Sequence, residues 1–95
     1  GAISYLAFSY TETDQVKALK INGVAPTAKN VENNKWKIWS YEHMYTKGKA
    51  TGETKSFLKY MESSKVQKKT VEKLGYISVS DMKVTKDADG NVAKN

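Results

Sequence analysis

The order of apolar and polar positions along the chain predicts a mixture of strands and helices, beginning with two strands. Apolar side chains occupy both alternating sets of the range 3–9, which is typical of a strand covered on both faces. The range 16–21 mixes lysines with apolar residues, and Asn22-Gly23 after it favours a tight turn because both residues tolerate a positive φ. We therefore predict strands over 3–9 and 16–21, the second folding back as a small hairpin before Pro26.

The middle of the chain predicts a short helix and then a strand rich in aromatic side chains. Thr27 is a suitable N-cap, but the asparagines in the range 28–34 are poor helix formers and limit this helix to about two turns. The range 38–46 then has the alternation of a third strand. One side of this strand carries four ring-bearing residues, Trp39, Tyr41, His43 and Tyr45. The other side carries Ile38, Ser40, Glu42 and Met44.

The second half of the chain predicts two amphipathic helices, over 53–62 and 64–74. Apolar residues recur at helical spacing in both, and Ser63-Ser64 separates them. Thr51 and Thr54 are alternative caps of the first helix, and Gly75 is expected to end the second in the left-handed conformation. From residue 81 to 95 the pattern weakens, so we expect a weakly ordered tail or a small hairpin. The predicted fold class is α/β.

Size and charge narrow the function classes. The 95 residues fit one domain or a piece of one. The net charge is +6, and every basic residue is a lysine. Lysine acts as a hydrated point charge, which disfavours sequence-specific reading of DNA. The lysines are then expected to solvate the surface or to attract polyanions weakly. The absence of cysteine excludes disulfides and thiolate chemistry, and no apolar run is long enough to cross a membrane. Because the chain opens on an apolar segment without methionine, we expect a fragment of a longer polypeptide.

Candidates for metal binding and catalysis are weak. Asp87, Asp89 and Asn91 have the first spacings of a calcium loop, but Gly90 is misplaced and no acidic residue follows at the twelfth position, so an ordinary turn is favoured. His43 is the single histidine, and no spacing supplies it with zinc ligands or with a catalytic triad. We therefore predict a protein that is not an enzyme, with no metal and no cofactor.

Two stretches could bind anions or nucleic acid. The range 47–52 combines glycines and lysines before a helix, but its order does not match a phosphate-binding loop, and a solvated connection is favoured. The aromatic residues of 36–45, interleaved with Lys35, Lys37 and Lys47, could stack the bases of a single strand. Their shared strand face favours packing in a core instead. A small basic single-stranded nucleic-acid-binding domain therefore remains the alternative function.

Several stretches, taken in order, carry a resemblance to a known family. Gly1-Ala2-Ile3-Ser4-Tyr5 resembles a Gly-Ala-Ile-Gly-Tyr strand, and the range 16–27, which reads VKALKINGVAPT, resembles a hairpin of that family. The range 45–48 reads YTKG like the end of a family strand, and 57–76 resembles its last helices with their Gly-Tyr exit. Over about residues 1 to 80, the chain is similar to the phosphate-binding proteins of phosphate ABC importers.

The resemblance implies part of a type II periplasmic-binding-protein fold, in which two α/β lobes close on a ligand about a hinge. Residues 1–80 would be the C-terminal portion of a lobe, and 81–95 the tail or small hairpin. The phosphate ligands of the family would lie upstream of Gly1, because its Ser-Gly-Thr signature and its arginine are absent here. No ligand-binding residue is carried over. Ser9, Tyr10 and Thr11, near a return crossing between lobes, are the candidate hinge or cleft residues.

The function implied by the resemblance is capture of inorganic phosphate outside the cytoplasm for uptake by an ABC importer. The implied partners are phosphate and the membrane permease subunits, and not nucleic acid. The implied location of the full-length protein is extracellular, anchored to the cell membrane as a lipoprotein, or periplasmic in a Gram-negative source.

Overall fold

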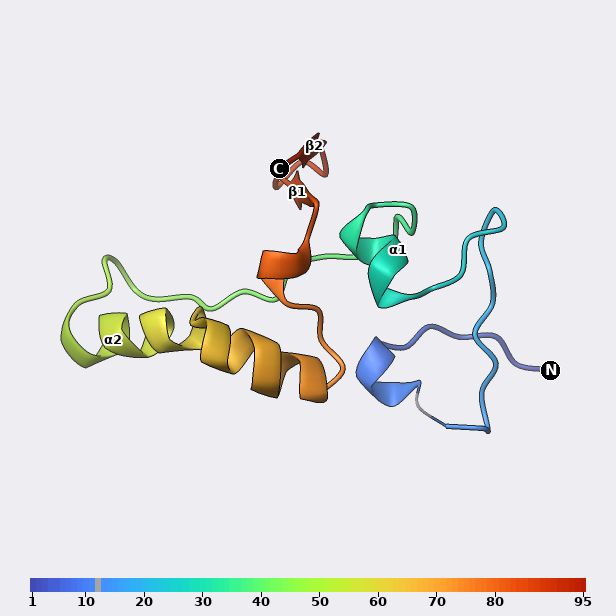
Figure 1. Cartoon of the computed structure of the whole chain (residues 1–95), viewed down its shortest axis with the longest axis horizontal. Coiled ribbons are helices and arrows are strands. Elements are labelled where there is room, and N and C mark those ends of the chain that lie inside the picture. The colour runs from blue at the N-terminus through green and yellow to red at the C-terminus, as the bar shows by residue number, and fades with distance from the viewer. Residues whose placement is uncertain (12) are drawn as a thin grey trace.

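The computed structural model describes residues 1–11 and 13–95 of the chain (Figure 1). Short helices dominate, and a two-stranded hairpin lies at the C-terminal end. The elements are, in order, the 3-10 helix η1 (Phe8–Tyr10), α1 (Ala28–Glu32), α2 (Gly52–Met61), the π-helix η2 (Val66–Val71), the 3-10 helix η3 (Val79–Asp81), β1 (Val84–Lys86) and β2 (Val92–Lys94). The structure therefore combines helices with a small amount of β-structure.

Helix α1 is short for the reasons that the sequence gives. The Thr27 hydroxyl caps it by accepting a hydrogen bond from the backbone N–H of Asn30 at 3.2 Å, as predicted. Asn33 is the C-cap, and Asn34 follows with a φ of 59°, a left-handed conformation that asparagine tolerates better than most residues. The expected limit of two turns is confirmed.

The two amphipathic helices are confirmed close to their predicted limits. Helix α2 begins at Gly52, one residue before the predicted start, and a second helical stretch runs from 64 to 73 with η2 as its centre. Thr51 occupies the N-cap position, although its side chain makes no capping hydrogen bond. Gly75 follows the second helix with a φ of 87°, as predicted for a left-handed end.

The strands predicted over 3–9, 16–21 and 38–46 are wrong for this structure, and so is the predicted βα layering within its described residues. Residues 1–7 form no regular element and are followed by η1, while the range 38–46 runs extended without a partner strand (Figure 1). Of 16–21, only an isolated bridge from Ile21 to Val24 forms, around the predicted Asn22-Gly23 turn. The physical reason is that strand hydrogen bonds need a neighbouring strand, and these segments have none here.

A hairpin forms near the C-terminus, in the segment 81–95 for which the sequence predicts either a weakly ordered tail or a small hairpin. Strands β1 and β2 pair antiparallel, with Val84 opposite Lys94 and Lys86 opposite Val92. The Asp87 side chain stabilises the connecting turn, because its Oδ1 accepts backbone N–H groups from Asp89 at 2.9 Å and from Asn91 at 2.8 Å. The interpretation of this segment as an Asx turn is confirmed.

The core is small and lies where α1 meets the C-terminal segment. Val31 of α1 packs with Met82 and Val84, all three less than a tenth exposed. Partly buried apolar residues from distant parts of the chain surround this cluster: Phe8, Trp36, Trp39 and Ile77. The backbone N–H of Lys83 donates to the Glu32 carbonyl at 2.8 Å, which joins the C-terminal segment to α1. The core therefore holds together the C-terminal segment, α1 and the N-terminal turn.

Much of the remaining apolar surface is exposed. The chain exposes 8245 Å², whereas a compact monomer of 10.6 kDa would expose about 5,500 Å². Its radius of gyration is 15.6 Å, against about 12 Å for a compact domain of this length. Ile3, Tyr5 and Tyr45 are each more than four-fifths exposed. Among the described residues, no helix is long and apolar enough to cross a bilayer.

Truncating a core methionine should destabilise the chain much more than truncating an exposed one. Met82 is 8% exposed and Met44 is 49% exposed. We expect Met82→Ala to lower the free energy of unfolding by about 2 kcal/mol, because the substitution leaves a cavity beside Val31. The matched change Met44→Ala should alter it by less than about 0.5 kcal/mol. Urea denaturation followed by tryptophan fluorescence measures both, and equal losses would contradict this account of the core.

Candidate functional site

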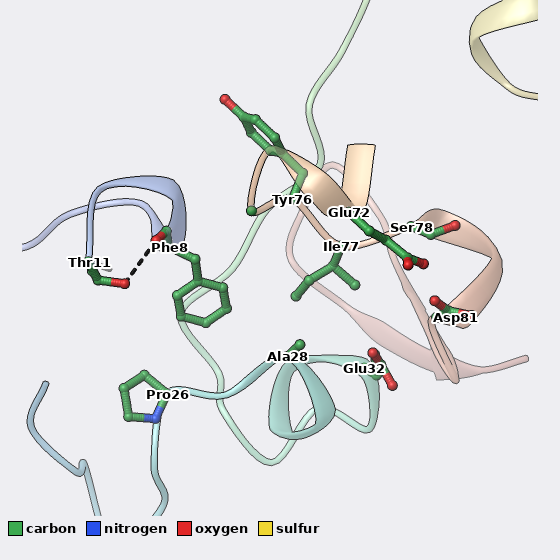
Figure 2. Close-up of a pocket in the computed structure, with 11 residues that line it drawn as sticks. Phe8, Thr11, Pro26, Ala28, Glu32, Glu72, Tyr76, Ile77, Ser78 and Asp81 are labelled. Atoms are coloured by element: carbon green, nitrogen blue, oxygen red, sulfur yellow. Dashed lines mark hydrogen bonds between the residues drawn. The ribbon is translucent and has the colours of Figure 1, made fainter. Parts of the chain in front are cut away.

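A cleft of about 460 Å³ lies between the N-terminal turn, α1 and the segment that follows the second helical stretch (Figure 2). Phe8 and Ile77 supply much of its apolar wall, together with Pro26 and Ala28 at the start of α1. The candidate residue Thr11 also lines it. The cleft therefore lies against the small core and is built from three parts of the chain that are distant in sequence.

The charged side chains lining this cleft are acidic. They are Glu32 from α1, Glu72 from the second helical stretch and Asp81 from η3. No basic side chain lines the cleft within residues 1–11 and 13–95. An oxyanion such as phosphate would be repelled by these carboxylates, so the cleft does not have the chemistry of a phosphate site.

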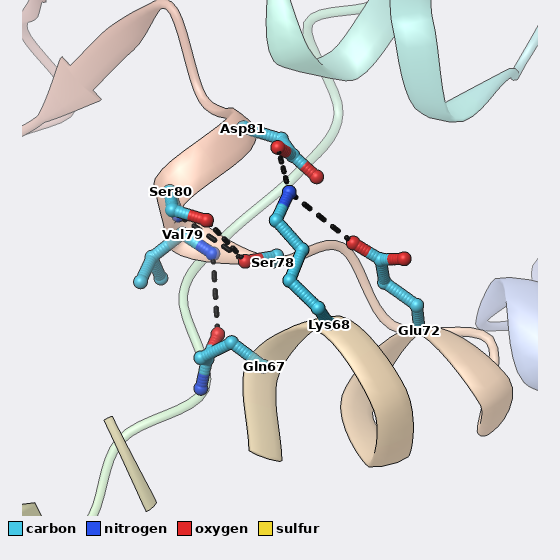
Figure 3. Close-up of polar contacts among 7 residues, drawn as sticks. All are labelled: Gln67, Lys68, Glu72, Ser78, Val79, Ser80 and Asp81. Carbon is cyan, nitrogen blue, oxygen red and sulfur yellow. Dashed lines mark hydrogen bonds and ion pairs between the residues drawn. The ribbon is translucent and has the colours of Figure 1, made fainter. Parts of the chain in front are cut away.

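Lys68 joins the second helical stretch to η3 by pairing with two of these carboxylates (Figure 3). Its Nζ donates a hydrogen bond to Asp81 Oδ1 and lies 3.6 Å from Glu72 Oε1. The hydrogen bond with Asp81 raises the pKa of Lys68, and the same bond lowers the pKa of Asp81. All three side chains are partly exposed, so water screens this ion pair.

Two polar contacts support the same junction. Gln67 Oε1 accepts the backbone N–H of Val79 at 3.3 Å (Figure 3). Ser78 is fully buried, and its hydroxyl lies 2.8 Å from that of Ser80 while accepting the Ser80 backbone N–H. Together with the Lys68 pair, these contacts fix η3 beside the helix.

The candidate hinge residues Ser9, Tyr10 and Thr11 lie in and immediately after η1. The Thr11 hydroxyl donates to the Phe8 carbonyl at 2.8 Å, which closes the turn on itself (Figure 2). Tyr10 is 71% exposed and does not line the cleft. Of the three, the structure brings only Thr11 to the cleft, and a hinge role for them stays a prediction.

Ser9 is held by a close backbone approach from Gly75. A Cβ at Gly75 would lie 2.8 Å from the Ser9 Cα, closer than real Cβ atoms come, and 3.1 Å from the Ser9 nitrogen, which is also a tight contact. Gly75 therefore has two reasons to be glycine: its positive φ and this contact. The sequence predicts the first reason, but it gives no signal for the contact with Ser9.

The aromatic residues of 39–45 share one side, as predicted, but they stack on one another. Trp39 and Tyr41 meet edge to face at 5.3 Å, and His43 lies 6.3 Å from Tyr41 and 5.8 Å from Tyr45 between ring centroids. Tyr45 is 86% exposed, so the expectation that it packs in a core is wrong. His43 lies in this row between the two tyrosines and is exposed, so its interpretation as a structural residue stays a prediction.

Lys86 of β1 covers Trp39 and attaches this row to the hairpin. Its Nζ lies 3.9 Å from the centroid of the Trp39 ring and donates to the Trp39 carbonyl at 2.7 Å. The backbone N–H of Lys86 donates to the Tyr41 hydroxyl at 3.3 Å. Partial burial lowers the pKa of Lys86, with a smaller contribution from Lys37. Because Lys86 already covers a face of the Trp39 ring, the geometry does not favour stacking of nucleic-acid bases on this ring.

The remaining candidates carry no ligand chemistry in this structure. Both Asp87 oxygens accept hydrogen bonds, Oδ2 from the Asn91 amide at 2.9 Å, so they face donors and not a cation. These bonds, led by that of the Asn91 side chain, lower the pKa of Asp87. Among the described residues, no cluster of metal-ligating side chains occurs.

Comparison with known proteins identifies a relative of this chain. No protein-family model matches the chain. Over 90 residues, which is 95% of its length, the chain is 58% identical to the phosphate-binding protein PstS of Bacillus subtilis (strain 168). This chain is homologous to a segment of PstS. It spans about 30% of the length of that relative.

The homology to PstS confirms the resemblance to phosphate-binding proteins that the sequence motifs indicated, and PstS itself is named as a phosphate-binding protein. It implies part of a periplasmic-binding-protein fold. The i,i+4 spacing of Lys68 and Glu72 is a sequence signal for their ion pair. No such signal indicates that Asp81, thirteen residues from Lys68, completes the cluster.

Removing the Lys68 ammonium should reveal a pH-dependent contribution to stability. Asp81 has a lowered pKa, so its stabilisation is present above its ordinary value of 3.8 and is lost as the pH falls through the lowered value. Lys68 has a raised pKa, so its contribution persists to at least its ordinary value of 10.5. We therefore expect Lys68→Met to lower Tm modestly between these values, and the difference from the parent chain to vanish in stronger acid.

Thermal unfolding followed by circular dichroism across this pH range measures the effect. Lys69→Met is the matched control, because Lys69 lies on the same helix and makes no ion pair within the described part of the chain. A difference that stays constant down to about pH 2, where carboxylates are protonated, would contradict the role of the Asp81 carboxylate.

Alanine at Gly75 should destabilise the chain more than alanine at Gly90. The two glycines have nearly the same φ, 87° and 85°, but nothing lies within 4 Å of a Cβ at Gly90. Both substitutions should lose about 1 kcal/mol to the left-handed backbone. Gly75→Ala should lose at least about 1 kcal/mol more, because its methyl group collides with Ser9. Equal losses in urea denaturation would mean that the contact with Ser9 contributes nothing.

Proposed function

We propose that this chain is the C-terminal part of an extracytoplasmic phosphate-binding protein that captures inorganic phosphate for an ABC importer. The observation that carries the proposal is 58% identity over 90 residues to PstS, a phosphate-binding protein. The proposed fold of the complete protein is the two-lobed type II periplasmic-binding-protein fold, with residues 1–80 in one lobe. The family resemblance of the ordered motifs supports this placement.

In this proposal the chain builds and positions the lobe, and other parts of the protein hold the phosphate. The chain contains no arginine and no Ser-Gly-Thr segment. Its cleft is lined by Glu32, Glu72 and Asp81, which disfavour an anion. Both facts support phosphate ligands in the remainder of the protein.

The proposed hinge or cleft contribution comes from Ser9, Tyr10 and Thr11. The close approach of Gly75 to Ser9 supports this role, because it brings the turn against the end of the second helical stretch. The residues before the turn are exposed and free of regular structure. A turn packed against a helix end and next to an irregular segment is a suitable place for a lobe to pivot.

The proposed partners of the complete protein are inorganic phosphate and the membrane permease subunits of the importer. The proposed location is outside the cytoplasm, as a lipid-anchored protein at the cell surface or in the periplasm of a Gram-negative source. These proposals follow from the family resemblance together with the homology to PstS.

A chimera tests the proposed function. The 90 matched residues of the Bacillus subtilis relative are replaced by those of this chain, and phosphate binding is measured by isothermal titration calorimetry. We expect a dissociation constant within about tenfold of the parent receptor, a change of no more than about 1.4 kcal/mol. The 95-residue chain alone should give no binding heat under the same conditions.

Two controls make the result decisive. The parent receptor lacking the matched segment should not bind phosphate, and cooperative thermal unfolding shows whether the chimera has folded. A folded chimera that does not bind phosphate contradicts the proposed function. A chimera that does not fold contradicts it as well, because a homologous segment should supply the same packing surface. Stoichiometric phosphate binding by the 95-residue chain would contradict the placement of the ligands elsewhere.

A further inference from the structure

The turn at Asn22-Gly23 carries chemistry that the proposed function does not use. Of the six asparagines in the chain, Asn22 alone precedes a glycine. Glycine has no Cβ to shield its backbone nitrogen, and asparagine is a thermolabile residue. We propose that Asn22 is a site of spontaneous deamidation, at which the chain converts its own asparagine into aspartate and isoaspartate. This modification is independent of the proposed function.

The reaction needs only the chain and water. The backbone nitrogen of Gly23 attacks Asn22 Cγ and forms a new C–N bond. The Asn22 side-chain nitrogen leaves as ammonia, taking the proton that the Gly23 nitrogen gives up. Water then opens the resulting cyclic succinimide. Attack of water at Cγ gives aspartate, and attack at the backbone carbonyl carbon of Asn22 gives isoaspartate, in which the main chain runs through Cγ. Nothing is oxidised or reduced.

The attacking nitrogen is accessible. Asn22 and Gly23 are both exposed, and the Gly23 N–H has no hydrogen-bond partner within residues 1–11 and 13–95. Nothing lies within 4 Å of the position that a Cβ at Gly23 would take. In Figure 1 the tip of the light blue segment before α1 projects away from the helices. Neither packing nor a hydrogen bond therefore shields this nitrogen.

The side-chain amide under attack is not held in place. Each of the other asparagines makes a side-chain hydrogen bond, whereas the Asn22 side chain makes none in the part of the chain that the structure describes. A hydrogen bond restricts the rotation that would bring Cγ to the next backbone nitrogen, so the other five are restrained and Asn22 is not. The restrained asparagines are Asn30, Asn33, Asn34, Asn91 and Asn95.

The turn itself is weakly held, so the backbone can rotate into the reactive geometry. Asn22 and Gly23 have φ values of 51° and 76°, and two hydrogen bonds between Ile21 and Val24, of 3.0 and 2.9 Å, close the turn. The preceding range 16–20 makes no backbone hydrogen bond within the described residues. An isolated pair of this kind is marginal in water and opens at low cost.

The hairpin near the C-terminus contains an internal comparison. An Asp-Gly pair can close the same ring by losing water, and Asp89-Gly90 is such a pair. The φ of Gly90 is 85°, close to that of Gly23, but the Gly90 N–H donates to the Asp87 carbonyl at 3.1 Å. The N–H groups of Asp89 and Asn91 donate to the Asp87 side chain. Hydrogen bonding therefore protects this pair and leaves Asn22-Gly23 open.

The modification changes both the charge and the backbone of the turn. Either product carries a carboxylate, so the formal net charge falls by one unit from +6. Isoaspartate also adds a carbon to the main chain, so Ile21 no longer lies opposite Val24 and the bridge between them is lost. Val24, Ala25 and Pro26 are half-buried and lead into α1. The change therefore occurs directly before the helix that carries Val31 of the core.

Peptide mapping by mass spectrometry tests the proposal. The 95-residue chain is incubated at mildly alkaline pH, with and without guanidinium chloride, and each deamidation adds about 1 Da because a hydroxyl replaces an amide NH2. In the native chain we expect Asn22 to react at least ~10-fold faster than every other asparagine, a barrier difference of about 1.4 kcal/mol. Its rate should lie within about threefold of its rate in denaturant, because the turn gives little protection.

Two outcomes of this measurement would overturn the proposal. One is an Asn22 that reacts at least ~10-fold more slowly in the native chain than in denaturant, since the turn would then protect it. The other is aspartate without isoaspartate at position 22, which would exclude the cyclic intermediate. Asp89 serves as the comparison: we expect it to isomerise in denaturant and to be protected in the native chain.

Two variants separate the chemistry from the looseness of the turn. Gly23→Ala strains the turn at its φ of 76° but shields the attacking nitrogen, so we expect deamidation of Asn22 to slow at least ~10-fold. An unchanged or faster rate would overturn the proposal. Asn22→Gln would need a larger ring and should abolish the mass gain of this peptide. A gain that remains would assign the modification to another residue and overturn the proposal as well.

Discussion

Pairing of backbone hydrogen-bonding groups is the constraint on which this structure depends. A helix pairs most of its own N–H and C=O groups, so α2 and the stretch from 64 to 73 form without a neighbouring strand. A strand needs a neighbour, and within residues 1–11 and 13–95 only β1, β2 and the bridge between Ile21 and Val24 have one. The chain is consequently well formed in its helices and open elsewhere, which accounts for its large exposed area.

A few long-range contacts organise what core there is. Val31, Met82 and Val84 bring α1 against the C-terminal segment, and Lys86 ties that segment to Trp39 across 47 positions of sequence. Lys68 and Gln67 fasten η3 to the helix on the other side. The C-terminal segment is thus the part that most other elements contact, although its sequence pattern is the weakest in the chain.

The sequence predicts what depends on neighbouring residues and misses what depends on distant ones. Capping by Thr27, the turn at Asn22-Gly23 and the left-handed Gly75 follow from local preferences and are confirmed. The predicted strands fail because alternation indicates that a segment can pair, and it does not indicate a partner. The close approach of Gly75 to Ser9 is likewise a tertiary contact with no local signal.

The candidate site illustrates the same limit for function. Apolar and acidic side chains from three segments create a cleft around Ile77, and its carboxylates disfavour an anion such as the phosphate after which PstS is named. A receptor that closes on its ligand distributes its binding groups over several segments, so one segment can retain the family sequence and still lack the ligand groups. Sequence identity to a binding protein and an anion-repelling cleft are therefore compatible, provided that the anion is bound by groups outside this segment.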